Sequence, residues 1–170
     1  MLLLDVDGVL TDGRIIIDDR GVESKHFHVR DGHGIVLLKR SGIDVGFITG
    51  RSCPVVGHRA KELQVTLLFQ GVKDKLRVYE RIKKKRGLTD GQIAYVGDDI
   101  VDLPVLRRVG LAVMSLCNSF FSASLEPLGK QTMLGRRHGY SIIWVNFLAG
   151  LRNTQKHNPT YKKAGRVFKY

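Results

Sequence analysis

The chain begins with the stretch Leu2-Leu3-Leu4-Asp5-Val6-Asp7-Gly8-Val9, in which an apolar run stops at two aspartates and a glycine. A short run that is apolar on both faces is typical of a strand buried between two helix layers in a parallel sheet. In open α/β sheets, ligands bind beyond the carboxyl ends of the strands, and Asp5 and Asp7 follow such an end. The stretch therefore predicts a buried strand at residues 2–6 and, at its end, the position of a site.

The same pattern recurs along the first two thirds of the chain. Further apolar runs predict strands at residues 45–48, 65–69, 93–96 and 111–113, and helical patterns lie between them at 34–40, 54–63, 75–86 and 100–109. Asp74 and Gly87 are placed to cap the third helix at its two ends. One segment breaks the alternation: residues 15–18 and 22–29 flank Asp19-Arg20-Gly21 and predict a β-hairpin after the first strand. These elements predict an α/β fold with a parallel sheet flanked by helices.

Length and composition exclude several classes of protein. A chain of 170 residues with 43% apolar residues fits about one globular domain. No apolar run approaches the ~20 residues that span a bilayer, and residues 1–4 lack the basic start of a signal peptide. Cys53 and Cys117 match no metal-binding spacing and are expected to be reduced thiols in a cytoplasmic protein. We therefore expect neither a membrane protein nor a secreted disulfide scaffold.

The net charge of +12 is distributed unevenly. Residues 1–114 carry 19 Lys and Arg against 15 Asp and Glu, whereas residues 115–170 carry nine against one. The basic excess therefore belongs to the C-terminal region, and it does not indicate a nucleic-acid-binding core. We expect nucleic acid as a partner only if this basic tail binds it.

Polar and acidic residues gather where the predicted strands end. Asp5 and Asp7 follow the first strand, and Asp98 and Asp99 follow the strand at residues 93–96. Carboxylates brought together raise one another's pKa unless a cation is present, and oxygen ligands of this kind suit Mg²⁺. Thr49 and Gly50 lie between a strand and a helix, where a hydroxyl and free amides can bind phosphate. Lys75, at the start of the next helix, is unfavourable to the helix dipole, which points to a functional reason for it.

These motifs, in this order, resemble those of the haloacid dehalogenase (HAD) superfamily. The resemblance extends from residue 1 to about residue 113 and is carried by the strings DVDGVLTDG, FHVRDGHGI, ITGR and AYVGDDIVDLPV, together with Lys75. It implies a Rossmann-like core without a cap domain. The strings are most similar to a capless phosphatase branch acting on 3-deoxy-D-manno-octulosonate 8-phosphate, a lipopolysaccharide precursor. Two alternatives stay open, a phosphatase of a related nonulosonate 9-phosphate and a catalytically idle module used for oligomerisation.

The resemblance implies a role for each matching residue. Asp5 would be the nucleophile that forms an aspartyl-phosphate, and Asp7 would be the general acid and then the general base. Mg²⁺ would be held by the carboxylates of Asp5 and Asp98 and by the main-chain carbonyl of Asp7.

The remaining motif residues would bind the substrate or orient the others. Thr49 and the Gly50 amide would bind phosphate oxygens, with Lys75 adding positive charge. Asp99 and Asp102 would orient metal-bound waters or Lys75. Arg30 and Arg51 are our candidates for contacts with the rest of the substrate.

The spacing of the motifs leaves no room for a lid. Asp7 and Thr49 are separated by 41 residues, and Thr49 and Lys75 by 25 residues. Neither gap holds a lid domain of ~60 residues or more, so a lone subunit would leave its site open to water. In the family that the chain resembles, neighbouring subunits of a homotetramer cover the site, and we expect a homotetramer here.

The resemblance to the family ends at about residue 113, next to the point where the balance of basic and acidic residues changes. We therefore divide the chain into a HAD-like phosphatase core at residues 1–114 and a divergent basic region at residues 115–170. Three origins of this region are open: a frameshift after about Met114, which we favour because the break falls inside an element, a genuine basic extension, or a new oligomer contact. Residues 141–148 are the part of it most suited to an apolar element.

Overall fold

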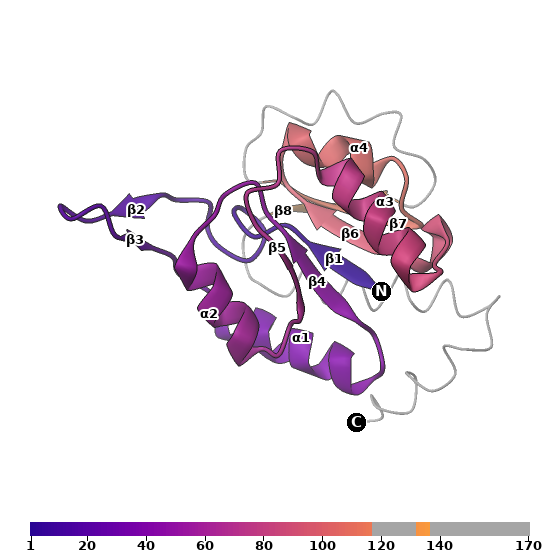
Figure 1. Ribbon diagram of the computed structural model, residues 1–170, viewed down its shortest axis with the longest axis horizontal. Helices are drawn as coiled ribbons and strands as arrows, with labels where there is room; N and C mark the ends of the chain where they lie inside the picture. The colour runs from indigo at the N-terminus through magenta and orange to yellow at the C-terminus, as the bar shows by residue number, and fades with distance from the viewer. Residues whose placement is uncertain (117–131, 137–170) are drawn as a thin grey trace.

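The computed structural model describes residues 1–116 and 132–136, and six strands of these residues form one parallel sheet (Figure 1). The strand order is β5-β4-β1-β6-β7-β8. The strands are β1 (Leu2–Leu4), β4 (Val45–Ile48), β5 (Leu67–Phe69), β6 (Ala94–Gly97), β7 (Leu111–Leu116) and β8 (Thr132–Arg136). Because β1 lies between β4 and β6, the residues that follow it lie in the middle of the sheet's carboxyl edge.

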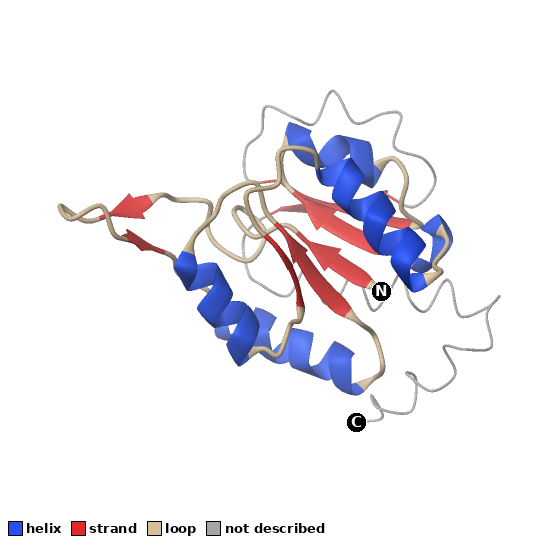
Figure 2. Cartoon of the chain, viewed as in Figure 1, coloured by secondary structure: helices blue, strands red, loops and turns tan. Residues whose placement is uncertain are grey.

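Helices cover both faces of this sheet (Figure 2). Within the described residues, the α-helices are α1 (Val29–Arg40), α2 (Pro54–Glu62), α3 (Lys75–Arg86) and α4 (Leu103–Leu106). Leu2 and Leu4 pack in the apolar cluster that includes residues of α1 and α2, whereas Leu3 packs in the cluster of α3 and α4. The alternation along β1 therefore places apolar side chains in both layers, and the predicted α/β class is confirmed.

A short hairpin projects from this core between β1 and α1 (Figure 1). It consists of β2 (Ile16–Ile17) and β3 (Glu23–Ser24), and the Asp18 side chain accepts hydrogen bonds from the amides of Arg20 and Val22 in its turn. The hairpin is confirmed, but the strands predicted at 15–18 and 22–29 are too long. Strand β3 ends at Ser24, and the Lys25 side chain that follows it is buried against Asp7 and Glu23. The hairpin is the only structure inserted between β1 and α1, so residues 5–28 contain no cap domain.

Several helix and strand boundaries differ from the prediction. Helix α1 starts at Val29 rather than at residue 34, because His28 caps it by accepting a hydrogen bond from the Arg30 amide. The glycines at positions 32 and 34 lower the helix propensity of this turn and hide it in the sequence.

The helix predicted at 100–109 is wrong in extent. A 3₁₀ turn, η2 (Ile100–Asp102), precedes the one-turn helix α4, in which proline occupies one of the first two positions. A further 3₁₀ turn, η1 (Asp90–Gln92), precedes β6. Strand β1 ends at Leu4 and not at residue 6, because the Val6 carbonyl accepts hydrogen bonds from the amides of residues 9–11 and begins a helical turn. The strand predicted at 65–69 begins only at Leu67.

The sheet continues past the point where the family resemblance ends. Strand β7 includes residue 114 and pairs in parallel with β8. Residues 117–131 and 137–170, with Cys117, the stretch 141–148 and most of the basic tail, lie outside the described residues. No helix in the part that the structure describes is both long and apolar enough to cross a membrane.

The N-terminal cap of α3 offers a test of local stability. The Asp74 side chain accepts a hydrogen bond from the Arg77 amide at 3.0 Å, so Asp74→Ala should lower the free energy of unfolding by about 1 kcal/mol. Urea denaturation followed by circular dichroism would measure the change. Asp19→Ala, an exposed aspartate in the hairpin turn, is the control and should leave the stability unchanged. Equal losses in the two variants would contradict the capping role.

Candidate active site

The loop after β1 brings two aspartates to the middle of the carboxyl edge. The Asp5 carboxylate is buried and accepts a hydrogen bond from the Val6 amide at 2.7 Å. Gly8 then adopts a φ of +84°, which L residues rarely adopt. A Cβ at Gly8 would lie 1.6 Å from Oδ2 of Asp98, so the side chain of Asp98 occupies the space that the missing Cβ leaves. This glycine lets the β1 and β6 loops approach each other.

The Lys75 side chain links the loop after β1 to the segment after β6. Its buried ammonium lies 2.9 Å from Oδ2 of Asp5 and 2.7 Å from Oδ1 of Asp102. Burial lowers the pKa of Lys75, but the charges and hydrogen bonds of Asp5 and Asp102 outweigh this effect, and the net shift is upwards. Lys75 therefore remains an ammonium between two carboxylates, which explains its position at a helix start that is unfavourable to a cation.

Asp102 organises the loop after β6. It is fully buried; its Oδ1 accepts hydrogen bonds from Lys75 and from the Tyr95 hydroxyl at 2.6 Å, and its Oδ2 accepts from the amides of Asp98 and Asp99. A Cβ at Gly97 would lie 2.5 Å from Cγ of Asp102, so glycine is required there as well. These contacts fix the direction in which Asp98 leaves the strand.

The electrostatics of the cluster favour a cation. Burial and the Asp102 charge raise the pKa of Asp5 to about 6, although Lys75 opposes them. Burial, together with the charges of Asp5, Asp102 and Asp99, raises the pKa of Asp98 to about 7. Carboxylates with raised pKa values gain most from an added positive charge.

The donor set fits a hard divalent cation such as Mg²⁺. One oxygen from each of Asp5, Asp98 and Asp102 lies within 4.8 Å of the others. Asp102 already accepts four hydrogen bonds, so Asp5 and Asp98 are the better placed ligands. Two carboxylates completed by water and phosphate oxygens are the coordination that Mg²⁺ prefers in proteins.

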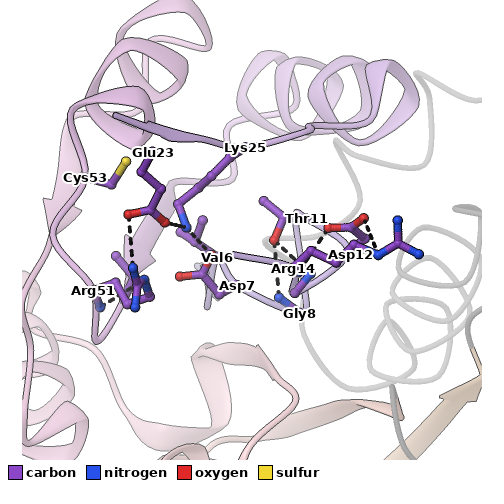
Figure 3. Close-up of polar contacts among 12 residues, drawn as sticks. Val6, Asp7, Gly8, Thr11, Asp12, Arg14, Glu23, Lys25, Arg51 and Cys53 are labelled. Atoms are coloured by element: carbon purple, nitrogen blue, oxygen red, sulfur yellow. Dashed lines mark hydrogen bonds and ion pairs between the residues drawn. The ribbon is translucent and has the colours of Figure 1, made fainter. Parts of the chain in front are cut away.

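A second charged cluster surrounds Asp7 (Figure 3). The ammonium of Lys25 lies 2.5 Å from Oδ1 of Asp7 and 2.7 Å from Oε1 of Glu23. Glu23 also pairs with Arg51 at 3.1 Å. The hydrogen bonds to Lys25 and Arg51 lower the pKa of the Glu23 carboxyl. This chain of ion pairs connects the hairpin to the loop after β1 and to the loop after β4.

The remaining predicted site residues are Thr49, Gly50, Arg51, Asp99 and Arg30. Thr49 is buried at the end of β4, and Gly50 and Arg51 follow it on the surface. Asp99 is exposed and accepts a hydrogen bond from the Ile100 amide. Arg30 is exposed in the first turn of α1, and its side chain makes no ion pair or hydrogen bond with the described residues. The structure therefore brings together Asp5, Lys75, Asp98 and Asp102, but it does not bring Arg30 into contact with them.

Sequence reasoning missed Lys25, Glu23 and Tyr95. Lys25 and Glu23 are two residues apart in a segment predicted to be an extended hairpin strand, where charged side chains are ordinary. The sequence indicates their contact only through their spacing, because residues i and i+2 of a strand lie on the same face. Tyr95 lies inside an apolar strand, and nothing in the sequence shows that its hydroxyl meets Asp102.

Comparisons with known proteins show which family the chain resembles. No protein-family model matches the chain. Over 113 residues it is 46% identical to 3-deoxy-D-manno-octulosonate 8-phosphate phosphatase KdsC of Yersinia pestis and 45% identical to that of Escherichia coli K12. The matched residues are 66% of this chain and 60% of the length of each relative. The match therefore leaves a substantial part of these curated relatives uncovered.

Solved structures agree in fold over a larger share of the chain. The Yersinia pestis 3-deoxy-D-manno-octulosonate 8-phosphate phosphatase superposes with a TM-score of 0.79 at 37% identity, with 91% of this chain and 82% of that chain covered. The Moraxella catarrhalis enzyme, solved with magnesium, phosphate and KDO, gives 0.75 at 34% identity, with 91% and 88% covered. The cobalt-bound Haemophilus influenzae phosphatase gives 0.76 at 30% identity, with 99% and 92% covered. With the motifs, the fold and these relatives in agreement, the chain belongs to the 3-deoxy-D-manno-octulosonate 8-phosphate phosphatase family, a capless group of the HAD superfamily.

Proposed function

We propose that the protein is a Mg²⁺-dependent phosphatase that hydrolyses 3-deoxy-D-manno-octulosonate 8-phosphate to 3-deoxy-D-manno-octulosonate and phosphate. The observation that carries the proposal is the convergence of Asp5, Lys75 and Asp98 at one edge of the sheet, with carboxylate oxygens of Asp5 and Asp98 within 4.8 Å of each other. Three charged groups held in this way suit phosphoryl transfer, which depends mainly on positioning and charge stabilisation.

Asp5 is the proposed nucleophile. Its Oδ1 is held by the Val6 amide and its Oδ2 by Lys75, so the carboxylate has one orientation. Attack on phosphorus forms a bond from the carboxylate oxygen to phosphorus and breaks the bond to the sugar oxygen, which gives an aspartyl-phosphate. Water then attacks this phosphorus, releases phosphate and restores Asp5.

Asp7 is the proposed proton donor and acceptor. It donates a proton to the departing sugar oxygen and then accepts one from the attacking water. Thr49 and the Gly50 amide, at the end of the neighbouring strand β4, are placed to bind phosphate oxygens. Lys75 contributes positive charge beside Asp5.

Mg²⁺ would be held by Asp5, Asp98 and the main-chain carbonyl of Asp7. When bound, it would neutralise the repulsion between a phosphate dianion and a carboxylate nucleophile. Asp102 keeps Lys75 and the two amides after Gly97 in place. Asp99 stays a candidate for orienting metal-bound water.

The substrate is inferred from the family. A keto-sugar acid carries a carboxylate besides its phosphate, and Arg51 follows Thr49 and Gly50 with 43% of its side chain exposed. Guanidinium groups bind carboxylates well, so Arg51 is the better of our two candidates for this contact, and Arg30 is the weaker one. A nonulosonate 9-phosphate would present the same groups on a longer chain and is the alternative substrate.

We also propose that copies of the chain cover the open site as a homotetramer. Four exposed apolar side chains lie on the hairpin: Ile15, Ile16, Ile17 and Val22. A projecting two-stranded edge with such residues suits pairing with other hairpins. We place the enzyme in the cytoplasm, where the buried free thiol of Cys53 would stay reduced.

The first test is metal-dependent phosphate release. The wild-type protein should release phosphate from 3-deoxy-D-manno-octulosonate 8-phosphate with Mg²⁺ and lose this activity in EDTA. Asp5→Asn, which keeps the shape of the side chain but removes the nucleophile, should show no release above background. A folded wild-type protein without release would contradict the proposed function and favour an idle module.

Metal affinity should depend on pH because of the raised carboxyl pKa values. Below pH 6 both Asp5 and Asp98 are protonated, and they lose their protons as the pH rises through about 6 and about 7. Since Mg²⁺ binds carboxylates, its affinity should rise over this range, as calorimetric titration would show. Asp98→Asn should weaken binding at every pH, whereas Asp12→Asn, outside the cluster, should not. A flat profile in the wild-type protein would contradict the assignment.

Gly8→Ala tests the close approach of the two loops. Its Cβ would displace Asp98, and a misplaced catalytic group costs about 10²-fold in rate. The matched control is Gly21→Ala, because Gly21 has a similar φ of +77° but a Cβ there meets nothing within 4 Å. Both variants should lose some thermal stability, and only Gly8→Ala should lose phosphate release. Equal activities would show that Asp98 does not need this position.

A further inference from the structure

Among the residues whose side chains the structure describes, two lysines are buried, and each contacts one aspartate of the first motif. Lys75 lies between Asp5 and Asp102. Lys25 lies between Asp7 and Glu23, and its side chain is 0% exposed. The proposed mechanism uses Lys75 but gives no task to Lys25.

Fold stability alone is a poor reason for the burial of Lys25. Removing an ammonium from water is costly, and ion pairs in a buried place often only offset that cost. An apolar side chain of the same length would fill the space without this cost. The charge therefore points to a task at Asp7.

The contacts of Asp7 show what that task is. Lys25 donates to Oδ1 of Asp7, whereas Oδ2 is buried and has no hydrogen-bond partner among the described residues. One carboxylate oxygen is thus engaged by the ammonium, and the other has no donor among the described residues. Glu23 holds Lys25 from its other side at 2.7 Å, so the ammonium cannot follow Asp7 if that side chain turns away.

We propose that Lys25 is a positioning residue that holds Oδ1 of Asp7 so that Oδ2 exchanges the proton with the sugar oxygen. The inference rests on the proposed function. It assigns the hairpin a part in the chemistry, because β3 supplies Glu23 and the residue directly after it supplies Lys25. Asp7 would then be oriented by a segment that leaves the sheet rather than by the sheet itself.

The test compares two leaving groups. A sugar alkoxide needs a proton as it departs, whereas p-nitrophenolate is stable without one, so a fault in the proton donor affects only the first ester. Lys25→Met should lower kcat on 3-deoxy-D-manno-octulosonate 8-phosphate by about 10²-fold and change kcat on p-nitrophenyl phosphate far less. Lys25→Arg, which keeps a charged donor, should recover part of the loss on the sugar ester.

Two further variants guard against a merely structural effect. Glu23→Gln keeps Lys25 but weakens its support, and it should lower kcat on the sugar ester selectively even if Lys25→Met does not fold. Lys39→Met is the matched control. Lys39 donates to the backbone carbonyls of Leu63 and Gln64 at the far end of α1 and α2, so its loss should not change the ratio of the two kcat values.

The outcomes separate the two proposals. Equal losses on both esters in the Lys25 and Glu23 variants, or no loss, would overturn the positioning role while the phosphatase stands. Wild-type protein that hydrolyses neither ester would overturn the proposed function itself. A selective loss on the sugar ester, recovered by arginine, is the expected result.

Discussion

Repulsion between carboxylates is the constraint on which the rest of the site depends. Asp5, Asp98 and Asp102 are drawn together at the middle of the sheet edge, where burial and, after it, the neighbouring carboxylates raise the pKa values of Asp5 and Asp98. Lys75 offsets part of this repulsion from inside the protein, between Asp5 and Asp102. Among the residues that the structure describes, no ammonium pairs with Asp98, so the remaining negative charge lies where a metal ion would bind.

The strand order brings the loops that carry the site residues together. Strand β1 lies between β4 and β6, so the loops that carry Asp5, Thr49 and Asp98 are neighbours although they are far apart in sequence. The loops can close up only because positions 8 and 97 have no side chain, since the carboxylates of Asp98 and Asp102 occupy that space. The glycines and the aspartates therefore form a single steric unit.

Much of this arrangement could be predicted from the sequence. The parts that could not be predicted have a common physical reason. Buried strands such as residues 2–4 and 45–48 are apolar on both faces, and acidic residues at strand ends indicate the edge at which Asp5 and Asp98 come together. Lys75 could be found because it conflicts with the helix dipole. Lys25 conflicts with no helix dipole or other local preference in the sequence. Its burial depends on the contact between the hairpin and Asp7, which is a property of the tertiary structure. The early start of α1 was hidden by two glycines in its first turns.

The hairpin would link the proposed assembly to the proposed chemistry. A phosphatase without a cap domain needs another means to exclude water, because charge interactions weaken in an open site. The hairpin carries exposed isoleucines on its projecting part and the Glu23–Lys25 pair at its base, 2.7 Å apart. A contact that orders the outer part would therefore also fix the ammonium beside Asp7. Subunit assembly and the orientation of Asp7 would then depend on the same short segment. A change that weakens assembly would therefore also alter the orientation of Asp7.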